Sequence, residues 1–564
     1  MKPLLALLFT LALAAPPASS QTQAPDYGML DGRSYNPKTD PDIDLFIGNW
    51  RDSLPRHTYG SLIERDILTK SAGDPLHPHT KGAVLTYINR LTHGILNTGY
   101  STTPSKLSGE QVVFYIDSGE GTFAAGGKTA ALRVGITVLL PPGIEFVMKN
   151  TGRVPLTMYL IAEPVPAGFV PRNEIVVKDE NILPIDTSTV HWSHIPKFFL
   201  GKKDGLATID GMAPVWFDGM TMGQPHSHCP GFEEIWFSLE GTPTILLGKQ
   251  IRPFPPGTAY KIPPDYMTAH STINVENKPV KTFWFLVRSV PEPAPPSYSM
   301  LYDLPFDPKT TPDIDLFMAN WKDSMPRHTH GSLVERDVFT KGDPLHPPAK
   351  GAVLKYVNRF VHATLYPHNV TTATTLTGEQ EVFYIISGTG TMTAGKKTAD
   401  LFPGIAVLMP SGLAFTMKNT GDEPLTMYLI AEPVPAGFRP NGDMLVVDEN
   451  KTAVSSSDAH WVGIVKPLFG TNDGLGTMES VITCQFSPMT FFHPHSHLDG
   501  CEEVWAALTD PIHVLLGKQI RFQEPGTAYL IPSNGKTPHA NFNLSDKPIK
   551  LFYFARYGDH ELRK

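Results

Sequence analysis

The chain has 564 residues, of which 41% are hydrophobic and 18% are charged, and its formal net charge is −8. This length exceeds what one hydrophobic core supports, and at about 150 residues per domain it predicts about four domains. The mild negative charge and the absence of a basic stripe argue against a nucleic-acid-binding protein. The 54 prolines and 47 glycines favour many short strands joined by turns over long helices.

The N-terminus is typical of a secretory signal. Lys2 precedes an apolar run from Leu4 to Ala15, and small residues around Ala18 form a cleavage site. The apolar run is shorter than the roughly 20 residues that span a bilayer, so no membrane anchor is expected. We therefore predict a signal peptide over residues 1–20 and export to the periplasm or the extracellular space.

An internal repeat divides the chain into two units. The segment Asp42–Phe46 returns as Asp313–Phe317, and Gly73–His77 returns as Gly342–His346. The offset is 271 at the first match (42 to 313) and 269 from the second match onward (73 to 342). A proline-rich segment over residues 289–303 reads as a stiff linker between the units. The units are expected to begin with extensions over residues 21–100 and 304–370.

Within each unit, short apolar runs bounded by Gly and Pro predict β-strands, for example Val112–Ile116 and Ile235–Phe237. Strands at this spacing indicate a sandwich or a barrel. One short helix is expected over Ile43–Arg51, with Asp42 as its cap. The four barrels are assigned to residues 101–170, 185–288, 371–439 and 455–558.

Two sets of histidines point to metal binding. His226 and His228 are one residue apart, and residues two apart in a strand point to the same face. A third histidine, His270, follows, and a nearby carboxylate adds an oxygen to the three nitrogens. The second unit repeats this spacing. The predicted ligands are His226, His228, Glu234 and His270 in the first unit, and His495, His497, Glu503 and His539 in the second.

This combination of motifs resembles the cupin superfamily, whose members are small double-stranded β-helix (jelly-roll) barrels. The match to the first family motif, which ends in a glycine, consists of His226, His228, Glu234 and Gly241. The second motif is met in part, by Pro263, His270 and Asn274, with Asp265 where glycine is usual. The resemblance covers nearly the whole mature chain and implies an all-β protein of four cupin barrels, arranged as two repeated bicupin units.

The resemblance also implies which barrels hold metal. In the first and third barrels, Phe146 and Phe415 stand at the histidine position of the second motif, and a phenyl ring cannot ligate. Val112 stands at the glutamate position of the first barrel, while Glu381 keeps it in the third. The first and third barrels are therefore predicted to be metal-free.

The choice between two adjacent glutamates follows from the family spacing. Neighbouring residues in a strand face opposite ways, so only one of Glu233 and Glu234 can point into the barrel. The six-residue gap to Gly241 selects Glu234, and the same alignment selects Glu503. Glu233 and Glu502 are expected to face outward or to pair with a cation.

A shell of three histidines and one glutamate leaves one or two positions open on a divalent transition metal, with Fe, Mn, Ni, Cu and Zn all suited to these ligands. By resemblance, the preferred function is a metal-dependent oxygenase of a small organic (phenolic, enolic or sugar-derived) substrate. Glu234 and Glu503 would act as ligand and local base. The alternatives are a metal-dependent lyase or isomerase of a small polar substrate, or a non-catalytic metal- or sugar-binding or storage cupin.

Several further residues leave alternatives open. Lys249 and Arg252 suit either an anionic substrate or a solvated hairpin, and the hairpin is favoured. His493 is a candidate acid or base that is private to the second site. A small-molecule substrate is the expected partner, and the two units are expected to pack with pseudo-twofold symmetry, so that the chain works as a monomer.

Overall fold

The structure is a computed structural model that describes residues 34–187, 191–290, 311–455 and 460–557. The predicted signal peptide, and the predicted linker from residue 291 onward, lie outside these residues. The described chain is all-β, as predicted. Its helices are short 3-10 turns: η1 Ile43–Phe46, η2 Trp50–Asp52, η3 Glu180–Ile182, η4 Lys202–Asp204, η5 Ile314–Phe317, η6 Trp321–Asp323, η7 Glu449–Lys451 and η8 Thr471–Asp473. No helix in the described part of the chain is long and apolar enough to cross a membrane.

The first barrel contains β2 (Arg56–Thr58), β3 (Leu62–Lys70), β4 (Ala83–Leu85), β5 (Arg90–Leu96), β6 (Ser105–Lys106), β7 (Glu110–Ser118), β8 (Gly121–Ala125), β9 (Lys128–Leu132), β10 (Ile136–Leu140), β11 (Glu145–Asn150), β12 (Leu156–Pro164) and β13 (Val176–Asp179). They form an 8-stranded sheet in the order β13-β10-β7-β12-β5-β3-β2, with β4 beside β3, and a 4-stranded sheet in the order β6-β11-β8-β9. The facing sides of both sheets enclose a core of apolar side chains.

The second barrel contains β1 (Ile47–Asn49), β14 (His194–Pro196), β15 (Leu200–Gly201), β16 (Gly211–Phe217), β17 (Thr221–Met222), β18 (Phe232–Glu240), β19 (Thr244–Leu247), β20 (Gln250–Pro253), β21 (Thr258–Lys261), β22 (His270–Asn274) and β23 (Val280–Arg288). One sheet runs β1-β21-β18-β23-β16-β14, with β15 beside β16, and the other runs β17-β22-β19-β20. Strands β1 to β5 come from residues 21–100, so this predicted extension contributes strands to both barrels.

The second unit repeats this plan. The third barrel contains β25 (Arg327–Thr329), β26 (Leu333–Lys341), β27 (Ala352–Leu354), β28 (Arg359–Leu365), β29 (Thr374–Thr375), β30 (Glu379–Ser387), β31 (Gly390–Ala394), β32 (Lys397–Leu401), β33 (Ile405–Met409), β34 (Ala414–Asn419), β35 (Leu425–Pro433) and β36 (Leu445–Asp448). The fourth contains β24 (Met318–Asn320), β37 (Gly463–Gly470), β38 (Ser480–Phe486), β39 (Thr490–Phe491), β40 (Glu502–Ala507), β41 (Ile512–Leu516), β42 (Gln519–Gln523), β43 (Thr527–Leu530), β44 (His539–Asn543) and β45 (Ile549–Arg556).

The helix predicted over Ile43–Arg51 is wrong in extent. Asp42 does cap a turn, since its side chain accepts a hydrogen bond from the Asp44 amide at 3.1 Å, but η1 ends at Phe46. Residues 47–49 then form β1, which pairs with β21, and η2 follows. Pairing with an open strand edge satisfies the backbone groups that a longer helix would have bonded internally.

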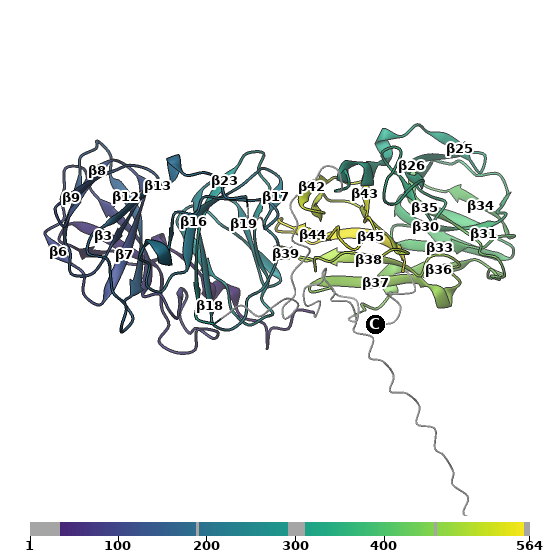
Figure 1. The fold of residues 1–564 in the computed structure, drawn as a ribbon. Helices are drawn as coiled ribbons and strands as arrows, with labels where there is room; N and C mark the ends of the chain where they lie inside the picture. Colours follow the sequence, from purple (N-terminus) through teal and green to yellow (C-terminus); the bar gives the residue numbers. More distant parts are fainter. Residues whose placement is uncertain (1–33, 188–190, 291–310, 456–459, 558–564) are drawn as a thin grey trace, which may run out of the picture.

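The two units meet through strand pairing between the second and fourth barrels. Thr221 of β17 pairs with Gln519 of β42, and Gln250 of β20 pairs with Thr490 of β39. At the offset of 269, Thr221 corresponds to Thr490 and Gln250 to Gln519, so each unit offers the same two positions to the other. The eight strands β17-β22-β19-β20-β39-β44-β41-β42 close into one ring. Figure 1 shows the resulting row, with the second and fourth barrels in the middle and the first and third at the ends.

Candidate metal centres

The ligands of the first centre come from three segments of the second barrel. His226 and His228 lie between β17 and β18, Glu234 lies in β18, and His270 begins β22. An isolated bridge joins His226 to His270: the His270 amide donates to the His226 carbonyl at 2.8 Å. This bridge holds the His-x-His segment against the first residue of β22, which brings all three imidazoles to one place.

The four predicted ligands of the first centre converge. Nε2 of His270 lies 3.3 Å from Nε2 of both His226 and His228. Oε2 of Glu234 lies 3.0 Å from His228 Nε2, and its Oε1 lies 3.6 Å from His270 Nε2. Two ligand atoms about 2.1 Å from one ion, at an angle of about 90° to 109°, are about 3.0 to 3.4 Å apart. The spacing of these donor atoms therefore fits a metal ion.

The second centre has the same geometry in the fourth barrel. Nε2 of His497 lies 3.2 Å from His539 Nε2 and 3.1 Å from Glu503 Oε2. His539 Nε2 lies 3.4 Å from Glu503 Oε1, and His495 completes the group, with all four ligand atoms within 4.8 Å of one another. Both predicted ligand sets are thus brought together, and all eight side chains are buried.

Hydrogen bonds orient the ligands in both centres. Nδ1 of His226 lies 2.9 Å from the Gln224 carbonyl, so its N–H donates there and leaves the Nε2 lone pair for an ion. Trp236 Nε1 donates to Glu234 Oε1 at 2.6 Å, which fixes the carboxylate. The second centre repeats both contacts. There, Nδ1 of His495 lies 2.8 Å from the His493 carbonyl, and Trp505 Nε1 donates to Glu503 Oε1 at 2.6 Å.

The protonation states suit a cation in the first centre. Burial is the largest cause that lowers the pKa of His226 well below its usual value and that of His270 to about 3, so both imidazoles are neutral at pH 7. Burial alone would raise the pKa of Glu234, but His228 and His270 outweigh it and hold that pKa well below its usual range. Neutral imidazoles and an ionised carboxylate are the forms that bind metals.

In the second centre, His497 and Glu503 shift each other's pKa values. Burial opposes protonation of His497, but Glu503 and Cys501 outweigh it and raise the pKa of His497 well above its usual value. The pKa of Glu503 is lowered to about 2, because His497 outweighs burial. An ionised Glu503 is the form that binds a metal.

Glu233 and Glu502 point out of their own barrels, as predicted, but the neighbouring barrel covers them. Both are buried, and each accepts hydrogen bonds from three successive backbone amides of the neighbouring barrel, residues 86–88 and 355–357 respectively. The predicted alternative of a cation holds for Glu233, since Lys261 Nζ lies 3.6 Å from Glu233 Oε2. The outer face of β18 packs on the first barrel, so both of its faces are covered.

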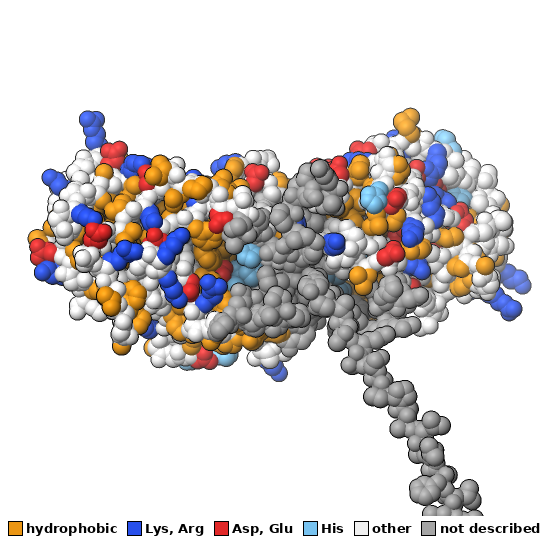
Figure 2. Space-filling model, in the orientation of Figure 1, with side chains coloured by type: hydrophobic (Ala, Val, Ile, Leu, Met, Phe, Trp, Pro, Cys, Tyr) orange, Lys and Arg blue, Asp and Glu red, His pale blue; other side chains and the backbone are white. Residues whose placement is uncertain are grey.

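A cavity of about 1120 Å³ leads to the first centre. His226, His228 and Glu234 lie on its wall, beside aromatic side chains that include Trp236 and Trp284. In Figure 2, orange hydrophobic side chains, blue Lys and Arg side chains and a pale blue histidine adjoin one another over the half that contains β16 and β18. A catalytic metal site needs such an approach for a substrate.

Sequence reasoning missed His194, which also lines this cavity. Its ring fills the space beside Gly223, which has no side chain. In the fourth barrel the two residue types are exchanged: Gly463 stands at the position of His194, and Phe492 stands at the position of Gly223. The two rings occupy equivalent surroundings. The centroid of the His194 ring lies 4.8 Å from that of Phe217 and 5.4 Å from that of Trp236. In the fourth barrel, the centroid of the Phe492 ring lies 5.0 Å from that of Phe486 and 5.5 Å from that of Trp505. The paired exchange of glycine and ring between the copies was the signal in the sequence.

Tyr553 was also missed, and it distinguishes the second centre. Its hydroxyl donates to Glu503 Oε2 at 3.1 Å and lies 2.5 Å from the hydroxyl of Tyr557. The first centre has Trp284 and Arg288 at these positions. Glu503 thus receives a hydrogen bond from a hydroxyl that the tryptophan at the matching position cannot supply.

The other residues singled out in the sequence lie as follows. His493 is buried and stacks on His495, with ring centroids 5.1 Å apart, so it stays a candidate acid or base beside the second centre. Lys249 pairs with Asp40 at 3.1 Å, and Arg252 pairs with Asp44 at 2.8 Å. These two cations attach the N-terminal segment to the second barrel.

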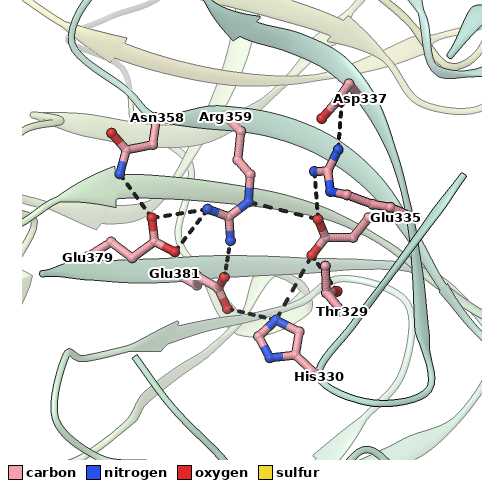
Figure 3. Close-up of polar contacts among 9 residues, drawn as sticks. Thr329, His330, Glu335, Asp337, Asn358, Arg359, Glu379 and Glu381 are labelled. Atoms are coloured by element: carbon pink, nitrogen blue, oxygen red, sulfur yellow. Dashed lines mark hydrogen bonds and ion pairs between the residues drawn. The ribbon is translucent and has the colours of Figure 1, made fainter. Parts of the chain in front are cut away.

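In the third barrel, Glu381 belongs to an ion-pair network (Figure 3). Arg359 donates to Glu381 at 2.6 Å, and His330 Nε2 lies 3.5 Å from the same carboxylate and 3.9 Å from Glu335. Phe415 is buried in the apolar core of this barrel, as Phe146 is in the first. Among the described residues, the three His/Cys/Asp/Glu groups that could hold a metal ion all lie in the second and fourth barrels.

One family model and several solved structures are similar to this chain. Residues 361–431, from β28 into β35, match the family model described as Cupin domain. Similar solved structures include protein Ylba from E. coli (16% identity, TM-score 0.33, 42% of this chain and 89% of that chain). Another is a mutant of Bacillus subtilis oxalate decarboxylase OxdC (13% identity, TM-score 0.35, 48% of this chain and 89% of that chain). A third is vicilin from Corylus avellana (12% identity, TM-score 0.34, 43% of this chain and 85% of that chain). A search among curated proteins gave no match.

Proposed function

The chain belongs to the cupin superfamily, and from that premise we propose that it is a metal-dependent enzyme whose active site is the first metal centre. The observation that carries the proposal is the cavity of about 1120 Å³ that ends on His226, His228 and Glu234. A structural metal site is closed by protein ligands, whereas this cavity gives a substrate room beside the ion. A bound Fe, Mn, Ni, Cu or Zn ion supplies Lewis acidity and, for the redox-active ions, electron transfer.

The protein's own groups position the reactants. Trp236 holds one oxygen of Glu234, and this fixes the carboxylate relative to His228. The aromatic wall favours a planar organic substrate. His194 lies on the same wall and can exchange a hydrogen bond with a substrate hydroxyl. The role of Glu234 as a local base, in addition to ligand, is part of this proposal.

For the reaction, we propose oxygenation of a small phenolic, enolic or sugar-derived substrate. The support is the ligand set, which leaves positions open on the ion, together with the aromatic cavity wall. The test is O₂ uptake and product formation by protein reconstituted with each metal in turn, over a panel of such compounds. His228→Ala should abolish turnover.

The remaining outcomes discriminate between the alternatives. Turnover without O₂ uptake would assign a lyase or an isomerase. Binding of the compounds without conversion, with every metal and with O₂ present, would assign a binding or storage protein and would refute the enzyme. His57→Ala, at an exposed histidine far from both ligand motifs in the sequence, serves as the control that should leave turnover unchanged.

We also propose that the protein is exported and works as a monomer. The N-terminal apolar run supports export, and the reciprocal pairing of β17 with β42 and of β20 with β39 supports a unit that already contains its own pseudo-twofold interface. Mass determination by light scattering and cleavage mapping of the secreted protein test these two statements. A dimer in solution, or an intact N-terminus, would refute them.

A further inference from the structure

Four basic side chains line the cavity that reaches the first centre: Lys178, Lys202, Lys203 and Arg288. Two carboxylates accompany them, with Lys178 2.8 Å from Asp204, and Lys202 2.9 Å from Asp210. Arg288 also approaches Asp210, at 3.9 Å. Four cations against two carboxylates leave an excess of positive charge on this wall.

The second unit lacks all four cations. At the offset of 269, the matching residues are Val447, Thr471, Asn472 and Tyr557, all of them uncharged. The carboxylates persist, because Asp473 stands for Asp204 and Glu479 for Asp210. The positive excess is therefore a property of the first centre, and the fold does not require it.

An apolar wall also lines this cavity. Phe198 and Trp284 meet edge to face with ring centroids 5.7 Å apart, and both line the cavity along with Phe199 and Leu286. In the second unit, Phe198 is replaced by Pro467 and Trp284 by a tyrosine. The cavity thus combines a cationic wall, an aromatic wall and a metal shell.

We propose that the first centre takes an organic carboxylate with an aromatic or otherwise apolar body, which places its carboxylate at the basic wall and its reacting end at the metal. This assignment rests on the proposed function. Lys203 and Arg288 select the anion, and Phe198 and Trp284 pack against the body of the substrate. The second centre does not select such an anion, because it lacks the cations.

The test compares two probes of one shape, 2-naphthoate and its neutral amide 2-naphthamide, by calorimetric titration. The variant carries residues of the second unit, K202T/K203N/R288Y, which the same fold already accommodates. We expect naphthoate to bind the wild type more tightly than the amide. We expect the variant to weaken naphthoate by roughly 5- to 30-fold, as for a few partly exposed charges, while the amide changes less than about twofold.

Three controls keep this result separate from the enzyme proposal. Binding is measured without turnover, so an inactive protein that still discriminates between the probes would refute only the enzyme. Metal-stripped protein should still bind naphthoate more tightly than the amide in the same titrations. If this preference disappears, the carboxylate binds the ion, and the proposal is overturned. An unchanged affinity of the variant for naphthoate would also overturn it. The reciprocal T471K/N472K variant should leave both affinities at the first centre unchanged.

Discussion

Gly223→Phe is expected to destabilise the protein, and His194→Gly is expected to restore most of the loss. A Cβ atom at Gly223 would lie 2.4 Å from Nε2 of His194, closer than real Cβ contacts allow. The fourth barrel accommodates a phenyl ring at the matching position because glycine replaces the histidine there. Beside each centre, a single ring therefore fills the same space. It comes from position 194 in the second barrel and from position 492 in the fourth.

The magnitudes follow from this exchange. Overpacking costs about 1–3 kcal/mol, and a whole phenyl ring belongs at the upper end. At about 2–4 °C per kcal/mol for a unit of this size, Gly223→Phe lowers Tm by about 6–12 °C. His194→Gly alone leaves a cavity and a more flexible backbone, at about 2–4 kcal/mol. In the double variant the new ring enters that cavity, so the double variant should lie within about 1 kcal/mol of the wild type, which means that the two changes couple by about 4–6 kcal/mol.

Differential scanning calorimetry of chelator-treated protein measures this coupling. Treatment with chelator removes any contribution from an altered metal affinity at the neighbouring centre. The reciprocal pair, Gly463→His with Phe492→Gly, gives a matched cycle in the fourth barrel. A double variant less stable than either single variant would refute the reasoning, because it would show that the two rings do not share one volume.

Three further predictions concern single side chains. Elemental analysis should give two metal equivalents for the wild type and one for either His228→Ala or His497→Ala; two equivalents in either variant would contradict the assigned ligands. Burial opposes protonation of His330, but Glu381 and a second carboxylate outweigh it and raise its pKa, so its protonated form stabilises the folded state below pH 6.5 and this contribution is lost as pH rises. His330→Tyr should therefore cost more stability at pH 6 than at pH 9, by thermal unfolding at both values, and an equal cost would contradict the ion pair. Glu502→Ala should cost about 3–5 kcal/mol by leaving three buried amides without an acceptor, while Glu502→Gln, which keeps an oxygen, should cost less than half of that.

The His-x-His pair of the metal shell was predictable because its spacing is local, whereas the choice of Glu234 needed the family spacing. His226 and His228 share a face because residues two apart in an extended chain point the same way. The apolar runs that follow in the sequence indicate strands. The internal repeat then served as a second observation of the same pattern. All eight ligands converge as the spacing indicated.

The errors arose where a contact depends on the packing of one barrel on another. Strand alternation correctly turned Glu233 away from the metal, but the sequence does not tell what covers the outer face of β18. That face packs on the first barrel, whose amides bind the carboxylate. The helix predicted to run to Arg51 fails for the same reason, because β21 offers a strand edge to residues 47–49 from far along the chain.

The two centres have the same ligands in different surroundings. A bound ion could therefore serve the stability of the fold in one centre and catalysis in the other. Metal binding to a folded site stabilises the fold, so a barrel can retain its ligands for that reason alone. The second centre lacks the basic wall, and a tyrosine hydroxyl donates to its carboxylate, as expected for an ion that serves stability. His497→Ala should then lower Tm and leave the turnover of the first centre unchanged, whereas His228→Ala should abolish turnover. A loss of half the turnover in His497→Ala would show instead that both centres act on the substrate.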